Sequence, residues 1–239
     1  LNNPSAPTLL MEATDETCLN KCDGTATVTP TGGTTPYSYS WVPTTPTDTN
    51  QNATGLCANF YTVTVTDSNN CIASDTISIN TIGLNLSITS IVPETCFGDA
   101  DGTATVAATG GTPNYNFVWS PTGGTAAMTT PSPVGAYVVT VTDDLNCSDS
   151  ISADISGPDL LTVVASENTA VSCNGSSDGA LIATVLGGTA NYQFSWNTTP
   201  VQSSQIATNL AAGTYIVTIT DDKGCTAIDT FILAEPAPI

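Results

Sequence analysis

The sequence predicts an all-β chain built from three tandem antiparallel β-sandwich domains in an extended row. Three observations lead to this fold class. One block of residues recurs three times along the 239 residues, apolar and polar residues alternate inside each copy, and glycine and proline punctuate the copies at short intervals. The recurrence is clearest for the three tryptophans, Trp41, Trp119 and Trp196, which are almost equally spaced.

Two anchor segments define the repeat. The first ends at a tryptophan, the second ends at a cysteine, and both keep their places in all three copies. Because a fixed period over a whole chain is typical of repeat proteins, we predict three domains, 1–82, 83–157 and 158–239, the last also holding the start of a linker to a following unit. The segments read GGTTPYSYSW (32–41), GGTPNYNFVW (110–119) and GGTANYQFSW (187–196), then YTVTVTDSNNC (61–71), YVVTVTDDLNC (137–147) and YIVTITDDKGC (215–225).

Each anchor segment has the period of a half-buried strand. Tyr37, Tyr39 and Trp41 lie at alternate positions and so share one strand face, and Val63 and Val65 alternate with threonines in the same way. Frequent turn signals and a central tryptophan predict a seven-strand sandwich in each unit. We therefore expect the aromatic side chains in the cores and not on a sugar-binding surface.

The predicted units follow one another with short connections. The first junction is Asn80-Thr81-Ile82-Gly83 and the second is residues 155–159. Such connections limit the swing of one domain against the next, so we expect a stiff row on the order of 100 Å long. Residues 234–239 resemble a third junction, which leads us to expect a further unit beyond it.

The composition excludes several classes of function. The chain has 2 Lys+Arg against 21 Asp+Glu and a net charge of -19, so it lacks the cations that bind nucleic acid or anionic membranes. It has no His for a catalytic triad or a zinc site. No apolar run approaches the ~20 residues of a membrane span, and no signal peptide begins the chain. We expect a mature or excised piece without enzymatic activity and without membrane insertion.

Eight cysteines predict disulfides and an oxidising, extracellular compartment. Every unit has an early and a late cysteine, and the first unit has two more. The repeat register predicts pairing inside each unit, and without a histidine or a CxxC pair we disfavour metal-binding thiols. The predicted pairs are Cys18–Cys71, Cys96–Cys147, Cys173–Cys225 and Cys22–Cys57.

Six recurring aspartates are the candidate binding residues. Three precede a glycine (Asp23, Asp101, Asp178) and three close a strand (Asp67, Asp143, Asp221). The interpretation we favour is a turn residue whose carboxylate accepts nearby backbone N–H groups. The alternative is a calcium site made from carboxylates clustered at one end of a sandwich or at a junction. We expect no cofactor apart from this calcium alternative.

The combined motif resembles the SprB-repeat family. It reads C-x-G-x-x-D-G, then G-G-T-x-x-Y-x-F-x-W, then G-x-Y-x-V-x-V-x-D-x-x-x-C, and the third unit, from Cys173 to Cys225, matches it best. The first unit departs from it at Asn20-Lys21-Cys22 and at Asn59. The tryptophan strand is more loosely similar to polycystic-kidney-disease (PKD) modules, which are immunoglobulin-like sandwiches. The resemblance implies very long cell-surface adhesins of Bacteroidota, exported by the type IX secretion system and in some cases moved during gliding motility.

A triplet of Asp, a hydroxyl residue and a hydrophobic residue follows each late cysteine. Its hydroxyl residues are Thr76, Ser150 and Thr230. The first two triplets resemble the O-glycosylation sequon of Bacteroidota, whereas the third has a phenylalanine. The interpretation we favour is an edge strand with exposed hydroxyls.

These features together predict a non-enzymatic stalk or filament segment of a repetitive secreted or cell-surface adhesin. It would hold a distal adhesive part away from the cell, with neighbouring repeats as its first partners. Lateral self-association and surface polysaccharide are further candidate partners. The alternatives are a calcium-assisted carbohydrate- or ligand-binding module and an accessory region of a secreted hydrolase.

Overall fold

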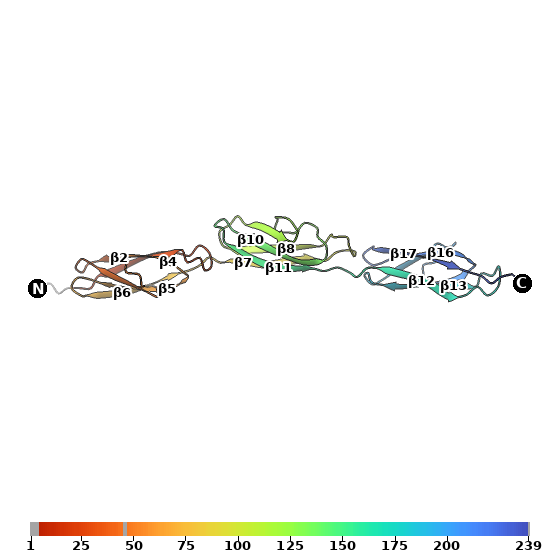
Figure 1. Cartoon of the computed structure of the whole chain (residues 1–239), viewed down its shortest axis with the longest axis horizontal. Coiled ribbons are helices and arrows are strands. Elements are labelled where there is room, and N and C mark those ends of the chain that lie inside the picture. The colour runs from red at the N-terminus through yellow and green to blue at the C-terminus, as the bar shows by residue number, and fades with distance from the viewer. Residues whose placement is uncertain (1–4, 45–46, 239) are drawn as a thin grey trace.

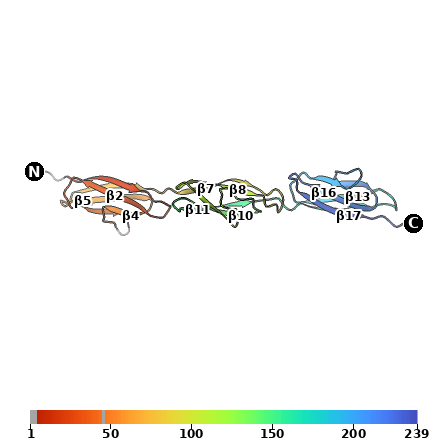
Figure 2. The same ribbon diagram turned by 90° about the horizontal axis from the view of Figure 1, so that it is seen from above.

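The computed structural model describes residues 5–44 and 47–238. Three β-sandwiches follow one another along a single axis, with the two termini at opposite ends of the row (Figure 1). The view from above also shows one line of sandwiches (Figure 2). No helix occurs among the described residues, and all strand pairs are antiparallel. The predicted all-β row is confirmed.

Each unit is built from strands of four to nine residues. The first unit has β1 (Thr8–Thr14), β2 (Gly24–Thr31), β3 (Ser38–Val42), β4 (Asn52–Leu56), β5 (Asn59–Thr66) and β6 (Ile72–Ile79). The second has β7 (Leu84–Val92), β8 (Thr103–Gly110), β9 (Asn116–Ser120), β10 (Gly135–Thr142) and β11 (Ser148–Ile155). The third has β12 (Thr162–Thr169), β13 (Gly179–Leu186), β14 (Gln193–Trp196), β15 (Ile206–Leu210), β16 (Gly213–Thr220) and β17 (Thr226–Leu233).

Two sheets face each other in every unit. They have the orders β1-β2-β4 and β3-β5-β6 in the first unit, β7-β8 and β11-β10-β9 in the second, and β12-β13-β15 and β14-β16-β17 in the third. The prediction of seven strands per unit is wrong: the described residues form six, five and six strands in the three units, and further pairings such as Trp41 to Asp48 and Gly102 to Ser132 are isolated bridges. In the second unit, Pro131 and Pro133 lack the N–H groups that a continuous ladder requires.

Each sandwich encloses its own hydrophobic core around a buried tryptophan. Trp41, Trp119 and Trp196 are at most 4% exposed. Their indole Nε1 atoms donate hydrogen bonds to backbone carbonyl oxygens in the loop that follows, at 2.9, 3.0 and 3.0 Å. The predicted role of the aromatic residues as core residues is confirmed.

A corner that recurs in all three units identifies the type of sandwich. The hydroxyls of Tyr61, Tyr137 and Tyr215 donate to the carbonyl oxygen four residues upstream, at 3.1, 2.9 and 2.9 Å. This contact ties the start of β5, β10 or β16 to the preceding loop and is typical of immunoglobulin-like domains. The chain is therefore an array of immunoglobulin-like sandwiches.

The glycine of each Asp-Gly pair packs closely against the last strand of its unit. A Cβ added at Gly24, Gly102 or Gly179 would lie 2.7, 2.4 or 2.8 Å from a side-chain carbon of the last strand of the unit. No side chain fits in this space, so the glycine is required for the first and last strands to close over the core.

We predict that Gly102→Ala destabilises the second unit by about 1–3 kcal/mol, because the new methyl group overlaps Ile155. Differential scanning calorimetry should show one transition moved to lower temperature. The control is Gly83→Ala, whose Cβ would have no heavy atom within 4 Å. Equal melting profiles for the two variants would contradict the close packing at Gly102.

Candidate functional site: the junctions between units

Backbone hydrogen bonds hold the start of the first linker and both ends of the second linker against the sandwiches. After β6, the carbonyl oxygen of Asn80 accepts a hydrogen bond from the N–H of Glu16 at 2.9 Å, and after β11 the carbonyl oxygen of Ser156 accepts one from Glu94 at 2.9 Å. Before β12, the carbonyl oxygen of Asp159 accepts the N–H of Gly188 at 2.9 Å. Few linker residues are therefore free to rotate.

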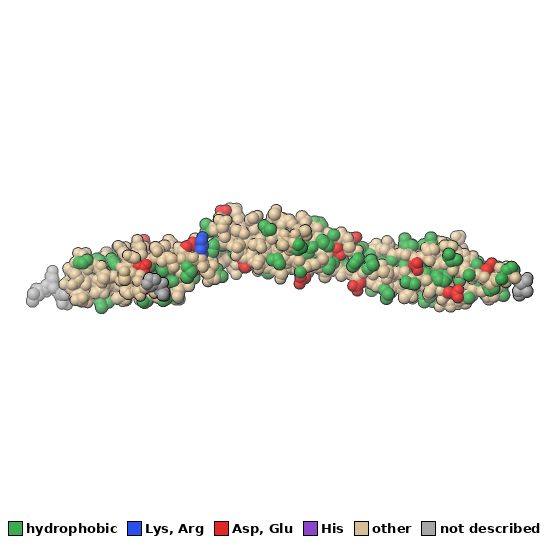
Figure 3. Space-filling view, viewed as in Figure 1, with side chains coloured by type: hydrophobic (Ala, Val, Ile, Leu, Met, Phe, Trp, Pro, Cys, Tyr) green, Lys and Arg blue, Asp and Glu red, His purple; other side chains and the backbone are tan. Residues whose placement is uncertain are grey.

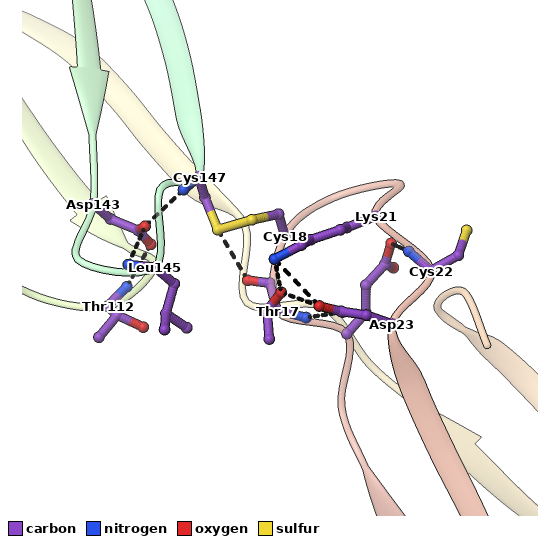
Figure 4. The surroundings of a disulfide bond; sticks show 10 residues. Thr17, Cys18, Lys21, Cys22, Asp23, Thr112, Asp143, Leu145 and Cys147 are labelled. Carbon is purple, nitrogen blue, oxygen red and sulfur yellow. Dashed lines mark hydrogen bonds and ion pairs between the residues drawn. A yellow bond between two sulfur atoms is a disulfide. The ribbon is translucent and has the colours of Figure 1, made fainter. Parts of the chain in front are cut away.

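Disulfides join neighbouring units at both junctions. Cys18 of the first unit bonds to Cys147 of the second (Figure 4), and Cys96 of the second unit bonds to Cys225 of the third. Both bonds have a sequence separation of 129 residues, with Cα–Cα distances of 5.4 and 5.7 Å. The early cysteine of one unit thus pairs with the late cysteine of the next.

This pairing corrects the sequence prediction. The predicted bonds Cys18–Cys71, Cys96–Cys147 and Cys173–Cys225 are wrong, and Cys71 and Cys173 are unpaired among the described residues. The remaining pair, Cys22–Cys57, is present within the first unit as predicted.

The physical reason for the correction is the direction of the strands. The early cysteine follows the first strand of its unit, and Glu16 beyond that strand forms a parallel bridge with Thr81 beyond the last strand. The late cysteine lies at the opposite end, just before the last strand begins. An eight-residue strand spans about 26 Å, whereas a disulfide needs Cα atoms within about 7 Å.

The early cysteine lies in a loop held by the aspartate of the Asp-Gly pair. Asp23, Asp101 and Asp178 accept the backbone N–H of the residue before the cysteine at 2.8, 2.8 and 3.1 Å. In the first unit the hydroxyl of Thr17 also donates to Asp23, at 2.6 Å, and Lys21 Nζ lies 3.3 Å from the same carboxylate (Figure 4). The bonds from the hydroxyl and the N–H of Thr17 lower the pKa of Asp23 to about 2.

The pKa values of Asp101 and Asp178 are lowered in the same way. The side chain and then the backbone N–H of Thr95 lower the first, and those of Ser172 lower the second. All three carboxylates are therefore stabilised in the charged form by the loop that carries the early cysteine.

A second carboxylate also holds the early loop, from a buried position in the first two units and from an exposed one in the third. Glu16 and Glu94 are 1% and 4% exposed, and they accept backbone N–H groups of this loop: that of Cys22 at 2.6 Å, and those of Gly98 and Ala100 at 3.1 and 2.7 Å. In the third unit Glu235, from beyond the last strand, accepts the N–H of Gly175 at 2.7 Å.

Sequence reasoning missed these glutamates. The signal was the Glu-Thr-Cys triplet at 16–18 and 94–96, which the third unit lacks because Val171 stands at the equivalent position.

The late cysteine lies in a hairpin turn held by the aspartate that closes the preceding strand. Asp67, Asp143 and Asp221 each accept the N–H of the late cysteine at 2.9 Å. They also accept the N–H two residues onward at 2.9, 3.0 and 2.9 Å. A third bond comes from the threonine of the Gly-Gly-Thr turn, at 2.9, 2.8 and 2.7 Å.

These bonds lower the pKa of all three aspartates. For Asp67, the N–H of Cys71 is the largest cause. For Asp143 and Asp221, burial acts in the opposite direction, and the N–H groups of the turn outweigh it. The six recurring aspartates thus anchor the early and late loops of the three units, and Asp23 with Asp143 and Asp101 with Asp221 anchor the loops that meet at the two junctions.

The turn interpretation of the six aspartates is confirmed, because each carboxylate accepts nearby backbone N–H groups. Among residues 5–44 and 47–238, no group of three or more His, Cys, Asp or Glu side chains is arranged to hold a metal ion. Calcium binding by these residues stays a prediction that this geometry does not favour.

The candidate glycosylation residues lie away from the junction loops. Thr76, Ser150 and Thr230 are exposed on β6, β11 and β17, each an edge strand of its sheet. The preceding aspartate accepts the N–H of each residue at 2.8 Å. The edge-strand interpretation is confirmed, and O-glycosylation stays a prediction.

Outside the junctions the surface carries few distinctive features. Acidic and hydrophobic side chains are scattered among uncharged ones on the face shown in Figure 3. The described part of the chain contains no helix with the length and apolarity to cross a membrane.

Comparison with known proteins identifies the repeat. The SprB repeat family matches three stretches, residues 11–45, 88–124 and 165–200. Each match contains the early cysteine and the tryptophan of its unit and ends before the late cysteine. The family model thus matches one stretch in each of the three units. No curated protein sequence matches the chain.

Solved structures of multidomain proteins align with most of the chain. The three N-terminal domains of the highly immunogenic outer capsid protein Hoc of bacteriophage RB49 are 14% identical, cover 94% of this chain and 97% of that one, and have a TM-score of 0.47. Titin domains I67–I69 are 12% identical, with coverages of 98% and 99% and a TM-score of 0.37. Sidekick-1 immunoglobulin domains 1–5 are 10% identical, with coverages of 98% and 60% and a TM-score of 0.41. At these scores the alignments carry no information on function.

We predict that cutting the first linker leaves the chain in one piece until it is reduced. A protease recognition sequence inserted between Ile82 and Gly83 would release residues 1–82 if pairing were within units. Because Cys18 bonds to Cys147, both fragments should migrate together on a non-reducing gel and separate with reductant. In the Cys18→Ser control they should separate without reductant. Separation of the unsubstituted chain would contradict the inter-unit bond.

We predict that the carboxyl carbon of Asp23 titrates with a midpoint near pH 2 in NMR spectra of the folded chain. This pKa lies below the ordinary value of 3.8, so the unfolded state binds the proton more tightly. The stability from Asp23 is present above about pH 4 and lost as the pH falls through about 2. Thr17→Val removes the hydroxyl donor and should move the midpoint toward 3.8. A midpoint of 3.8 in the unsubstituted chain would contradict the proposed hydrogen bonds.

Proposed function

We propose that this chain is a force-resisting, non-enzymatic stalk or filament segment of a repetitive cell-surface protein. It would hold a distal adhesive part away from the cell. The observation that carries the proposal is the staggered pair of inter-unit disulfides, Cys18–Cys147 and Cys96–Cys225, in a row of sandwiches.

The stagger makes two overlapping covalent rings. One ring closes at residues 18 and 147, the other closes at 96 and 225, and residues 96–147 belong to both. A single backbone cut anywhere between Cys18 and Cys225 therefore leaves the two fragments covalently joined. Disulfides inside separate units would leave both linkers as points where one cut divides the row. This property suits a chain exposed to proteases outside the cell.

The same rings limit how far the chain can be stretched. When the termini are pulled, the force passes from Cys18 to Cys147 through the first disulfide and then along the backbone of residues 147–96. From Cys96 it passes to Cys225 through the second disulfide. Even with every strand unfolded, this route is roughly a third of the extended length of the reduced chain. The disulfides thus limit the maximum extension of the chain even after the sandwiches have unfolded.

Each junction also has two covalent connections, the linker and the disulfide. One flexible linker lets neighbouring domains swing freely, which is the default for domains with small interfaces. A second attachment point removes most of these rotations. This arrangement favours a spacer that keeps its direction over a binding module that adapts to its partner.

Composition and family support an extracellular location. Structural disulfides persist in oxidising compartments, and the net charge of -19 opposes non-specific association between chains. The SprB repeats connect the chain with the adhesins, type IX export and gliding motility that the sequence resemblance implies. Under this proposal its first partners are neighbouring repeats.

We predict that single-molecule stretching distinguishes the stalk from a passive string of domains. The oxidised chain, pulled by its termini, should stop extending at roughly a third of the length that it reaches with reductant, because the rings bypass the rest of the chain. A variant lacking both inter-unit bonds (C18S, C147S, C96S and C225S) should extend more than twice as far as the oxidised chain.

The matched control removes the bond inside the first unit. Because Cys18–Cys147 already bypasses residues 22–57, the C22S and C57S variant should reach the same final length as the unsubstituted chain. Equal extensions with and without the inter-unit bonds would refute the force-resisting role.

A further inference from the structure

Cys71 and Cys173 are the unpaired cysteines of the described chain, and they are complementary. Cys71 is the late cysteine of the first unit, so it corresponds to Cys147 and Cys225. Cys173 is the early cysteine of the third unit, so it corresponds to Cys18 and Cys96. Four cysteines at these two repeat positions are bonded, always early to late and always between units.

The late half of a junction is already formed around Cys71. Asp67 accepts the N–H groups of Cys71, Asn69 and Thr34 at 2.9 Å each, the arrangement that Asp143 makes around the bonded Cys147. The difference is exposure: Cys71 is half-buried, whereas Cys147 is only 6% exposed. In the bonded case the neighbouring unit covers the sulfur, and the carbonyl oxygen of Thr17 lies 3.1 Å from it (Figure 4).

The early half is likewise formed around Cys173. The N–H of Ser172 donates to Asp178 at 3.1 Å, and the carbonyl oxygen of Cys173 accepts the N–H of Ser176 at 3.0 Å. The carbonyl oxygen of the bonded Cys96 accepts the N–H of Asp99 in the same way, at 3.1 Å. Cys173 itself is exposed. Both thiols thus stand in loops shaped for an inter-unit bond.

We propose that Cys71 and Cys173 are the two halves of a further inter-unit disulfide, each made to bond the complementary cysteine of another unit of this repeat. Between two copies of this chain, the bond is Cys173 of one copy to Cys71 of the next, head to tail. It cannot form within one copy, because the second unit separates the first from the third (Figure 1) and a disulfide needs Cα atoms within about 7 Å.

Bond formation needs an oxidant, for which we name a small-molecule disulfide such as oxidised glutathione. The thiolate of Cys173 attacks one glutathione sulfur and releases one glutathione thiol. The thiolate of Cys71 then attacks the Cys173 sulfur of the mixed disulfide and releases the second. Two protein thiols lose two protons and two electrons, and one glutathione disulfide becomes two glutathione thiols.

The test uses the whole chain in a glutathione redox buffer. At about 1 mM protein, the order of the effective concentration that a short linker provides, a ladder of covalent oligomers should appear on a non-reducing gel. Peptide mapping should find Cys71 bonded to Cys173, and free thiols should fall together with the loss of monomer. A chain that stays monomeric, or a ladder without this bond, overturns the proposal.

Two single variants separate complementary pairing from random oxidation. Cys71→Ser keeps only Cys173 free, and Cys173→Ser keeps only Cys71 free. Each alone should remain largely monomeric, whereas an equal mixture should give a dimer that contains one copy of each. Random oxidation would give the Cys173–Cys173 dimer, the mixed dimer and the Cys71–Cys71 dimer in a ratio of about 1:2:1. That result would contradict the proposal.

This inference depends on the geometry of the junctions and not on the stalk role. Oligomers that form in a chain without the stretching limit would refute the proposed function alone. A stretching limit without oligomers would refute this inference alone.

Discussion

The direction of the strands in an immunoglobulin-like sandwich controls the rest of this structure. The early cysteine leaves the first strand at one end of the unit, and the late cysteine precedes the last strand at the other end. A strand is several times longer than a disulfide can reach, so the early and late cysteines of one unit cannot meet. They meet the cysteines of neighbouring units instead. In this chain, repetition of one module produces two overlapping covalent rings.

The recurring carboxylates serve this arrangement as internal anchors. An aspartate or glutamate that accepts two or three backbone N–H groups holds a tight loop in shape, because it satisfies donors that would otherwise be unpaired. Asp143 holds the turn of Cys147, and Asp23 with Glu16 holds the loop of Cys18. The loops of both sulfurs are therefore held by contacts that do not involve the disulfide. The carboxylates recur in every unit because the loops that they hold recur in every unit.

Much of the fold could be predicted from local pattern. Alternation around Trp41 and Val63 gave the strands and the buried face, because the side-chain period of a strand can be read from neighbouring residues. The strand count could not be predicted, since whether a segment pairs continuously depends on partners distant in sequence. Glu235 shows the same limit for the site: it replaces a glutamate missing at Val171 from a different part of its unit.

The amino-acid sequence by itself determined the repeat, the period, the core residues and the aspartates that shape each loop. All of these follow from local composition and spacing, since turns and strand faces are short-range properties. Only the tertiary structure decided which cysteines bond, because pairing depends on which end of a sandwich each loop occupies and on which unit lies against it. The early cysteine of one unit therefore pairs with the late cysteine of the next unit instead of with that of its own unit. This offset links the separate domains covalently into one row.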